Sequence, residues 1–201
     1  MLKKRVAVLV SGGGTNLEAI LDAEKSGIIR SGETVLVISN IEDAYALKRA
    51  KNHGIKAVTI TKKSCGGQAQ FEQRLIETLD MEKIDLVVLA GFLSILTVLF
   101  TARYENKIIN IHPSLIPSFC GKGFYGLRVH EAALEYGVKV TGATVHFANE
   151  VPDGGRIIMQ KAVDVLPGDT PEALQKRVME EAEWVLLPRA IEYVCSQPSF
   201  Q

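Results

Sequence analysis

Two side chains that suit acid–base chemistry stand close together near the middle of the chain. They are Asn110 and His112, in the segment Ile109-Asn110-Ile111-His112-Pro113. An extended backbone points side chains at this spacing to the same side. An amide donor beside an imidazole suits a reaction in which an oxygen becomes negatively charged and a proton moves. Such a pair alone is more often a core histidine bonded to an asparagine, but its place at the end of a predicted strand favours a functional site.

A carboxylate that could join this pair lies in a glycine-flanked turn, as Asp153 of Pro152-Asp153-Gly154-Gly155. A carboxylate beside an imidazole fixes the tautomer of the ring and favours its charged form. Pro-Asp-Gly is also a common turn sequence in which the aspartate bonds only its own backbone. The segment by itself is compatible with both interpretations.

A glycine-rich turn, Ser11-Gly12-Gly13-Gly14-Thr15-Asn16, separates the first apolar run from a segment of helical period. Glycines let the backbone approach a ligand, and a helix N-terminus offers unpaired N–H groups, so a phosphate is the natural occupant. The turn lacks the ending of the NTPase loop and the register of the dinucleotide loop. A plain strand-to-helix turn, capped by Thr15 or Asn16, is the alternative.

Two other kinds of site are disfavoured by the spacing of their characteristic residues. The four histidines include no pair at i, i+4 and have no cysteine companion, and the three cysteines form no CxxC pair, so we expect no metal. No GxSxG sequence is present, which argues against a serine nucleophile on a strained turn.

The elements that must position these residues alternate between apolar, β-branched runs and segments of helical period. Strands are predicted at residues 5–10, 34–39, 56–60, 86–90 and 107–111, and helices at 15–26, 42–52 and 68–81. This order predicts an α/β fold, with a mostly parallel twisted sheet covered by helices on both faces. After residue 110 the pattern changes to an antiparallel pair at 138–147 and 156–165 and a long closing helix at 170–195.

Composition limits the possible partners of the chain. Its 201 residues carry 23 basic and 23 acidic side chains, so it lacks the field with which a general nucleic-acid or anionic-membrane binder finds its partner. The charge-free run at 86–100 is shorter than the roughly 20 residues of a membrane span. We expect one cytoplasmic domain over 1–201 that acts on small molecules, as a monomer or homodimer.

Taken together, these segments resemble the folate-dependent formyltransferases, above all the members that formylate glycinamide ribonucleotide (GAR). The most specific part is Asn110-Ile111-His112-Pro113-Ser114-Leu115-Ile116-Pro117, followed by Val140-Thr141-Gly142 and Asp153-Gly154-Gly155. The resemblance runs from Val6 to about Pro188 and implies a Rossmann-like formyltransferase fold. It implies that 10-formyltetrahydrofolate, as co-substrate and without a metal, donates its formyl group to the amine of GAR through a tetrahedral intermediate, in purine synthesis.

The resemblance also implies roles for individual residues. Asn110, His112 and Asp153 align with the catalytic trio, in which Asp153 raises the pKa of His112. Gly14, Thr15, Asn16 and Glu183 align with residues that bind GAR. The cofactor-binding residues implied are Leu93, Ser94, Ile95, Leu96, Asn110, Asn149 and Asp153. Residues 1–105 are then the phosphate-binding half, and 106–201 the catalytic and folate-binding half.

Three departures from the family pattern accompany the resemblance. Gln68 stands where many members carry an arginine, and the segment 119–128 is longer than the commoner pattern. Glu183-Trp184 stands where Glu-His is usual, with one more residue in the helix before it.

Alternatives remain at this point: another formyltransferase or a hydrolase that uses formyltetrahydrofolate, or a non-catalytic folate- or nucleotide-binding regulator. Methionyl-tRNA formyltransferase is expected to carry a further nucleic-acid-binding domain, and the hydrolase an N-terminal regulatory domain. A regulator is expected to have lost part of the trio, whereas all three residues are present.

Overall fold

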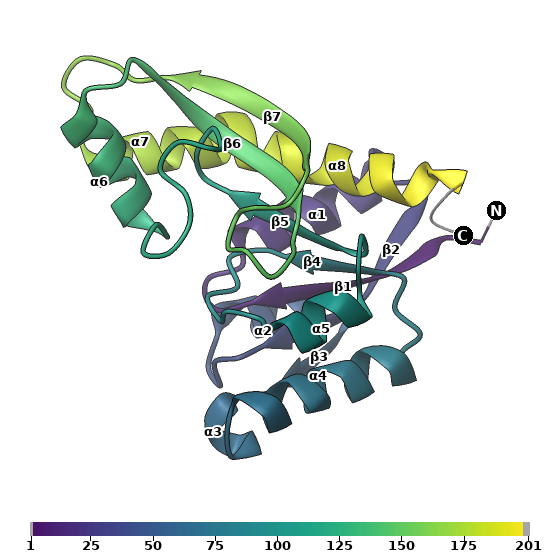
Figure 1. The fold of residues 1–201 in the computed structure, drawn as a ribbon. Coiled ribbons are helices and arrows are strands. Elements are labelled where there is room, and N and C mark those ends of the chain that lie inside the picture. The colour runs from purple at the N-terminus through teal and green to yellow at the C-terminus, as the bar shows by residue number, and fades with distance from the viewer. Residues whose placement is uncertain (1, 199–201) are drawn as a thin grey trace.

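A single sheet with the strand order β3-β2-β1-β4-β5-β6-β7 forms the frame of the protein (Figure 1). The structure is a computed structural model that describes residues 2–198. The strands are β1 (Lys4–Val10), β2 (Gly32–Ser39), β3 (Lys56–Thr59), β4 (Leu86–Leu89), β5 (Ile108–His112), β6 (Val140–Phe147) and β7 (Ile157–Asp164). Strands β1 to β5 pair in parallel, whereas β6 pairs antiparallel with both β5 and β7. The predicted fold class is therefore confirmed.

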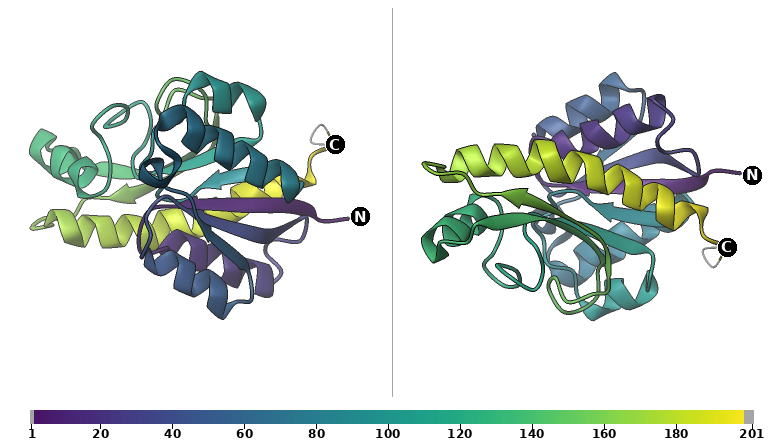
Figure 2. Two further views of the ribbon diagram at one scale, coloured as in Figure 1. Left: turned by 90° about the horizontal axis from the view of Figure 1, so that it is seen from below. Right: turned by 90° about the horizontal axis from the view of Figure 1, so that it is seen from above.

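Helices cover both faces of this sheet, as the two views of Figure 2 show. They are α1 (Thr15–Lys25), α2 (Tyr45–Asn52), α3 (Lys62–Cys65), α4 (Gln68–Met81), α5 (Val98–Arg103), α6 (Leu127–Tyr136), α7 (Pro171–Val178) and α8 (Trp184–Ser196), with the π-helical turn η1 (Met179–Glu183) between α7 and α8. Strand β1 is buried on both sides: Val8 contacts the core under α1 and α8, and Leu9 the core under α4 and α5. This two-sided burial explains why the strand is apolar without alternation.

Several predicted element boundaries are wrong in detail. Helix α2 begins at Tyr45 rather than at residue 42, and the predicted closing helix is interrupted by the π turn. Helices α3 and α5 were not predicted, because each is too short to show a helical period. A capping box does mark α3, since the Thr61 hydroxyl accepts a hydrogen bond from the Ser64 N–H at 2.9 Å.

The order of the strands reverses between β1 and β4, since the chain runs outward from β1 to β3 and then returns to β4 on the other side. In parallel sheets the carboxyl ends of strands on either side of such a point border a crevice that binds ligands. Three segments meet at this edge: residues 11–14 after β1, residues 90–97 after β4, and the end of β5 with Asn110 and His112. The fold therefore places the predicted site residues at the expected edge.

Candidate active site

A cavity of about 750 Å³ opens at this edge of the sheet. Its wall includes Asn16, Leu93, Ser94, Ile95, Leu96, Asn110, His112, His130, His146, Asn149, Asp153 and Glu183, together with residues 121–126. The volume lies within the range of pockets for small molecules and cofactors. Most of the residues predicted to act on substrates therefore line one hollow, although they come from distant parts of the chain.

Asp153 lies at the centre of the polar cluster in this cavity. Its Oδ2 lies 3.4 Å from His112 Nδ1 and accepts a hydrogen bond from the Gly121 N–H at 2.8 Å. Its Oδ1 lies 3.5 Å from His146 Nε2. Burial alone raises the pKa of Asp153, but the hydrogen bonds and positive charges of these neighbours outweigh it, so the pKa falls below its usual value. The carboxylate is thus held ionised between two imidazoles.

His112 is buried, and an acceptor faces each of its ring nitrogens. Nε2 lies 2.9 Å from the Phe119 carbonyl, and Nδ1 faces Asp153. The predicted contact with Asp153 is therefore present. Burial lowers the pKa of His112, and the charge of Asp153 raises it, as the resemblance implied, but by less, so the pKa stays below its usual value.

His146 belongs to the cluster, although it was considered in the sequence only as a metal ligand. Its Nδ1 lies 2.9 Å from the Phe147 carbonyl and therefore carries a proton, so Nε2 is an acceptor when the ring is neutral and a donor when it is charged. The Asn110 amide donates to this Nε2 at 3.1 Å, and the same Nδ2 lies 3.4 Å from Asp153 Oδ1. His146 thereby fixes which end of the Asn110 amide carries the donors. The signal in the sequence that could have found His146 is the alternation of side chains along the two predicted strands. Once the strands pair, this alternation places His146 beside Asn110.

Local backbone geometry explains how the cluster forms. Asn110 and His146 are direct partners in the antiparallel register of β5 and β6. Asp153 has a φ of 56°, a conformation that aspartate tolerates better than most residues. Gly155 follows at a point where a Cβ atom would collide with the Phe147 carbonyl. The turn therefore needs its glycine in order to bring the carboxylate back over the strands.

The lining of the cavity also includes a second polar pair, Asn16 and Glu183. The buried Asn16 amide donates to Glu183 Oε2 at 2.6 Å. Burial raises the pKa of Glu183, and the bond from Asn16 opposes this only in part. Glu183 is the last residue of the π turn, and turns of this kind often accompany functional sites. Asn16 and Glu183 are thus brought together, as a common role in binding one substrate requires.

The glycine loop lies beside this pair but does not form the wall of the cavity. Gly14, with φ of 73°, is the N-cap of α1, so the alternative that Thr15 or Asn16 caps the helix is wrong. Thr15 is exposed, and neither it nor Gly14 lines the cavity. The first turn of α1 offers N–H groups without a side-chain cap. These donors remain available to an anion.

The segment 93–96 forms an apolar wall, where Leu93 and Ile95 are 59% and 62% exposed. Asn149, which also lines the cavity, accepts a hydrogen bond from the Val151 N–H at 3.0 Å and so shapes the turn that ends at Asp153. Exposed apolar side chains beside a cavity with convergent polar groups are typical of a small-molecule site.

His130 is a further cavity residue that the sequence did not single out. It is 1% exposed, neither ring nitrogen has a hydrogen-bond partner within residues 2–198, and burial together with the charge of His112 lowers its pKa to about 4. The segment 119–128 contacts the polar cluster through its backbone, since the Phe119 carbonyl faces His112 and the Gly121 N–H donates to Asp153.

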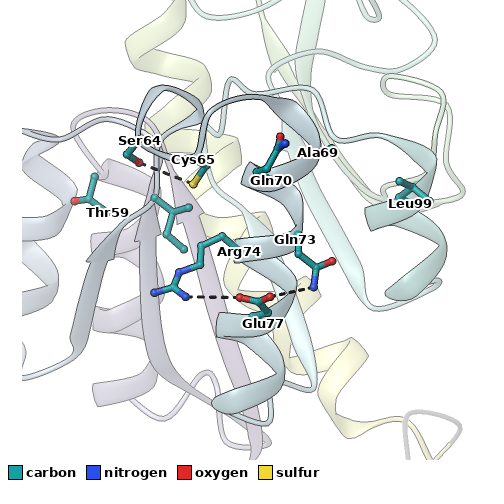
Figure 3. A pocket seen from close by; sticks show the side chains of 10 residues that line it. Thr59, Ser64, Cys65, Ala69, Gln70, Gln73, Arg74, Glu77 and Leu99 are labelled. Carbon is teal, nitrogen blue, oxygen red and sulfur yellow. Dashed lines mark hydrogen bonds and ion pairs between the residues drawn. The ribbon is translucent and has the colours of Figure 1, made fainter.

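A second hollow, of about 770 Å³, lies over α3 and α4 (Figure 3). The charged side chains in its lining are Arg74 and Glu77, which are 60% and 48% exposed and lie 3.6 Å apart. Water screens exposed, mutually paired charges, and nothing in this lining resembles the buried polar cluster of the first cavity, so this hollow is a poor candidate for catalysis. Within residues 2–198 no group of His, Cys, Asp and Glu side chains is arranged to hold a metal ion, and no helix is long and apolar enough to cross a membrane.

Comparison with known proteins agrees with this geometry. A family model described as formyl transferase matches residues 4–191. The phosphoribosylglycinamide formyltransferase of Haemophilus influenzae is 40% identical over 94% of the chain and 86% of its own length. The trifunctional purine biosynthetic protein adenosine-3 of Gallus gallus is 44% identical over 96% of the chain, which spans only 19% of that protein.

The solved structure of glycinamide ribonucleotide transformylase 1 from Symbiobacterium toebii superposes with a TM-score of 0.89. It is 42% identical, and the alignment covers 96% of this chain and 88% of that one. The family match over most of the chain, and an identity far above the level at which only a fold is shared, lead to one conclusion: the chain belongs to the formyl transferase family.

Proposed function

We propose that the protein transfers the formyl group of 10-formyltetrahydrofolate to the amine of GAR, giving formyl-GAR and tetrahydrofolate. The observation that carries this proposal is the convergence of Asn110, His112 and Asp153 in one cavity that the Asn16–Glu183 pair also lines. The trio then suits a group that forms an oxyanion, and the pair suits an amine linked to a sugar phosphate. Membership of the family supports the same chemistry.

The polar cluster supplies the groups that direct transfer between two small molecules needs. The Asn110 Nδ2 has two hydrogens: one bonds His146 Nε2 at 3.1 Å, and the other makes the longer contact of 3.4 Å with Asp153 Oδ1. The second hydrogen can turn from Asp153 to the oxygen that becomes negative when the amine attacks the formyl carbon. His112 stabilises the same oxygen and carries protons, while Asp153 orients the imidazole. A preorganised donor of this kind lowers a barrier by roughly 3–4 kcal/mol.

The remaining cavity residues suit binding. Glu183 has one carboxylate oxygen bonded to Asn16, and its other oxygen is available to the substrate amine. The N-terminus of α1, at Gly14 and Thr15, offers N–H donors to the phosphate. The wall formed by Leu93, Ser94, Ile95 and Leu96 faces the pterin, and Asn149 lines the same cavity.

A hydrolase that uses the same donor is the alternative that the polar cluster alone does not exclude, because water could take the place of the amine. The test is to follow tetrahydrofolate release from a 10-formylfolate donor by absorbance, with and without GAR. We expect release to depend on GAR and formyl-GAR to form in equal amount. Release at the same rate without GAR contradicts the transferase and favours the hydrolase.

Other expectations from the sequence stay predictions: a cytoplasmic location, a monomer or homodimer, a reaction without metal, and the absence of nucleic-acid or membrane partners. The division into halves at residues 105 and 106 also stays a prediction.

A further inference from the structure

The donor wall, which we define as residues 93–96, has an unusual kind of support. It lies between β4 and α5 and belongs to no helix or strand. Within residues 2–198, none of its N–H or carbonyl groups takes part in a backbone–backbone hydrogen bond. A loop with so few backbone bonds keeps one conformation only if side chains satisfy its polar groups.

Side chains from two different regions hold the wall at its two ends. At the first end, Ser11 Oγ accepts from the Leu93 N–H at 2.8 Å, and Asn40 Nδ2 donates to Ser94 Oγ at 2.7 Å. At the second end, Gln68 Nε2 donates to the Ile95 carbonyl at 3.1 Å. The first anchor comes from the ends of β1 and β2, and the second comes from the first turn of α4.

Glu72, one turn after Gln68 on α4, completes the second anchor. Its Oε1 accepts from Gln68 Nε2 at 2.5 Å and from the Thr97 N–H at 2.7 Å, and its Oε2 accepts from the Thr97 hydroxyl at 2.5 Å. The residue is only 2% exposed. A buried carboxyl group is costly unless donors surround it, and here the donors are Thr97, next to the wall, and Gln68, which also bonds the wall.

This carboxylate does not touch the cavity. Neither Glu72 nor Thr97 is part of its lining, whereas Leu93, Ser94, Ile95 and Leu96 are. Any effect of Glu72 on binding must therefore pass through the wall. Because Gln68 turns its amide toward both Glu72 and the Ile95 carbonyl, it extends the same anchor rather than reaching a ligand.

We infer that Glu72 is a positioning residue for the folate donor: through Thr97 and Gln68 it holds the wall in the shape that the donor needs. The inference rests on the proposed function, since it assigns the wall to the donor rather than to the acceptor. The residues proposed to bind the acceptor, Asn16 and Glu183, have their own support from α1 and the π turn. Loss of the second anchor should therefore affect the two substrates unequally.

The test is the variant Glu72→Gln, which keeps the size of the side chain but has one acceptor oxygen and places an NH₂ group among N–H and O–H donors. We expect the KM for 10-formyltetrahydrofolate to rise by about tenfold or more, the effect of losing a hydrogen bond to a charged group. The KM for GAR and kcat should stay within about twofold of the values of the unaltered protein, because neither the Asn16–Glu183 pair nor the polar cluster is altered.

The matched control is Glu77→Gln on the same helix. Glu77 lies on the outer face of α4, where Figure 3 shows it beside Arg74 and Gln73, and it has no contact with the wall. This variant removes the same charge from the same helix and should leave both KM values unchanged. Thr97→Val keeps the N–H but removes the hydroxyl, so it should raise the KM for the donor by less than Glu72→Gln does. It replaces Glu72→Gln as the test if that variant does not fold.

Binding of tetrahydrofolate, measured by calorimetry without GAR, separates this inference from the proposed function. If the unaltered protein binds tetrahydrofolate and Glu72→Gln binds it about tenfold more weakly, the inference holds independently of turnover. If both bind it equally, or if the KM values for donor and acceptor rise together, Glu72 has only a structural role and the inference is wrong. Failure of the unaltered protein to bind tetrahydrofolate instead overturns the proposed function.

Discussion

Asp153 is the residue on which the arrangement of the others depends. One of its oxygens faces His112 and the Gly121 N–H, and the other faces His146 and Asn110. Each neighbour is a donor or can become one, so the carboxylate stays ionised. Because a low pKa here is maintained by its partners, changes at this residue should alter the protonation of the cluster as well as its geometry.

Replacement of His112 tests the role of the imidazole directly. His112→Ala should retain binding of both substrates, since the wall and the Asn16–Glu183 pair are untouched. Turnover should fall by at least about a hundredfold, the usual effect of losing an acid–base group. The measurements are kcat and, for each substrate, binding by calorimetry. Near-normal turnover would remove His112 from the proposed chemistry.

Replacement of the carboxylate tests how it controls the imidazole. The charge of Asp153 raises the pKa of His112, against the larger lowering by burial. Asp153→Asn removes this charge while keeping the size of the side chain, so the pKa of His112 should fall further. The acidic limb of the pH–rate profile should then move to lower pH, provided that His112 produces it. A limb at the same pH in the variant contradicts the pairing.

At the scale of elements, the start of α1 depends on a glycine, Gly14, whose replacement should destabilise the fold. A Cβ atom at Gly14 would lie 2.6 Å from Ala46 Cβ, and φ is 73°. Gly14→Ala combines a steric clash with an unfavourable left-handed conformation, which alone costs roughly 1–2 kcal/mol. We expect a lower free energy of unfolding in urea and weaker binding of GAR. Gly12→Ala, where no atom lies within 4 Å, is the control and should lose much less stability.

The sequence predicted long elements well and contacts between elements less completely. Strand β1 and helix α4 were predicted because burial on both faces, or on one helical face, imposes a clear pattern. His146 was missed because its importance arises only when β6 pairs with β5. The anchor at Glu72 gave no signal, since an acidic residue on an amphipathic helix is usually read as solvent-exposed. The sequence therefore predicts residues within one segment more easily than residues that meet through pairing or burial.

At the scale of the whole molecule, the sheet separates two cores whose contributions can be measured separately. Phe71 of α4 is fully buried in the core under α4 and α5. Phe71→Ala should lower the free energy of unfolding by roughly 3–5 kcal/mol, through lost burial and the cavity it leaves. Met81→Ala, at the end of the same helix and 69% exposed, should change it by less than about 0.5 kcal/mol. Thermal or urea unfolding measures both, and similar losses in the two variants contradict this account.

The π turn between α7 and α8 has a consequence for how related chains are compared. An added residue in a regular helix rotates everything after it by about 100°, which would point Glu183 away from Asn16 or α8 away from the sheet. If this helix has one residue more than the family pattern, as the resemblance implies, the widened π turn is where that residue would be absorbed, so that Glu183 keeps its contact with Asn16. An unmatched position just before this glutamate in an alignment therefore records a local bulge rather than a shifted or lost contact. If gaps were placed elsewhere in the alignment to avoid this unmatched position, Glu183 would be aligned with the wrong residue of the related chain.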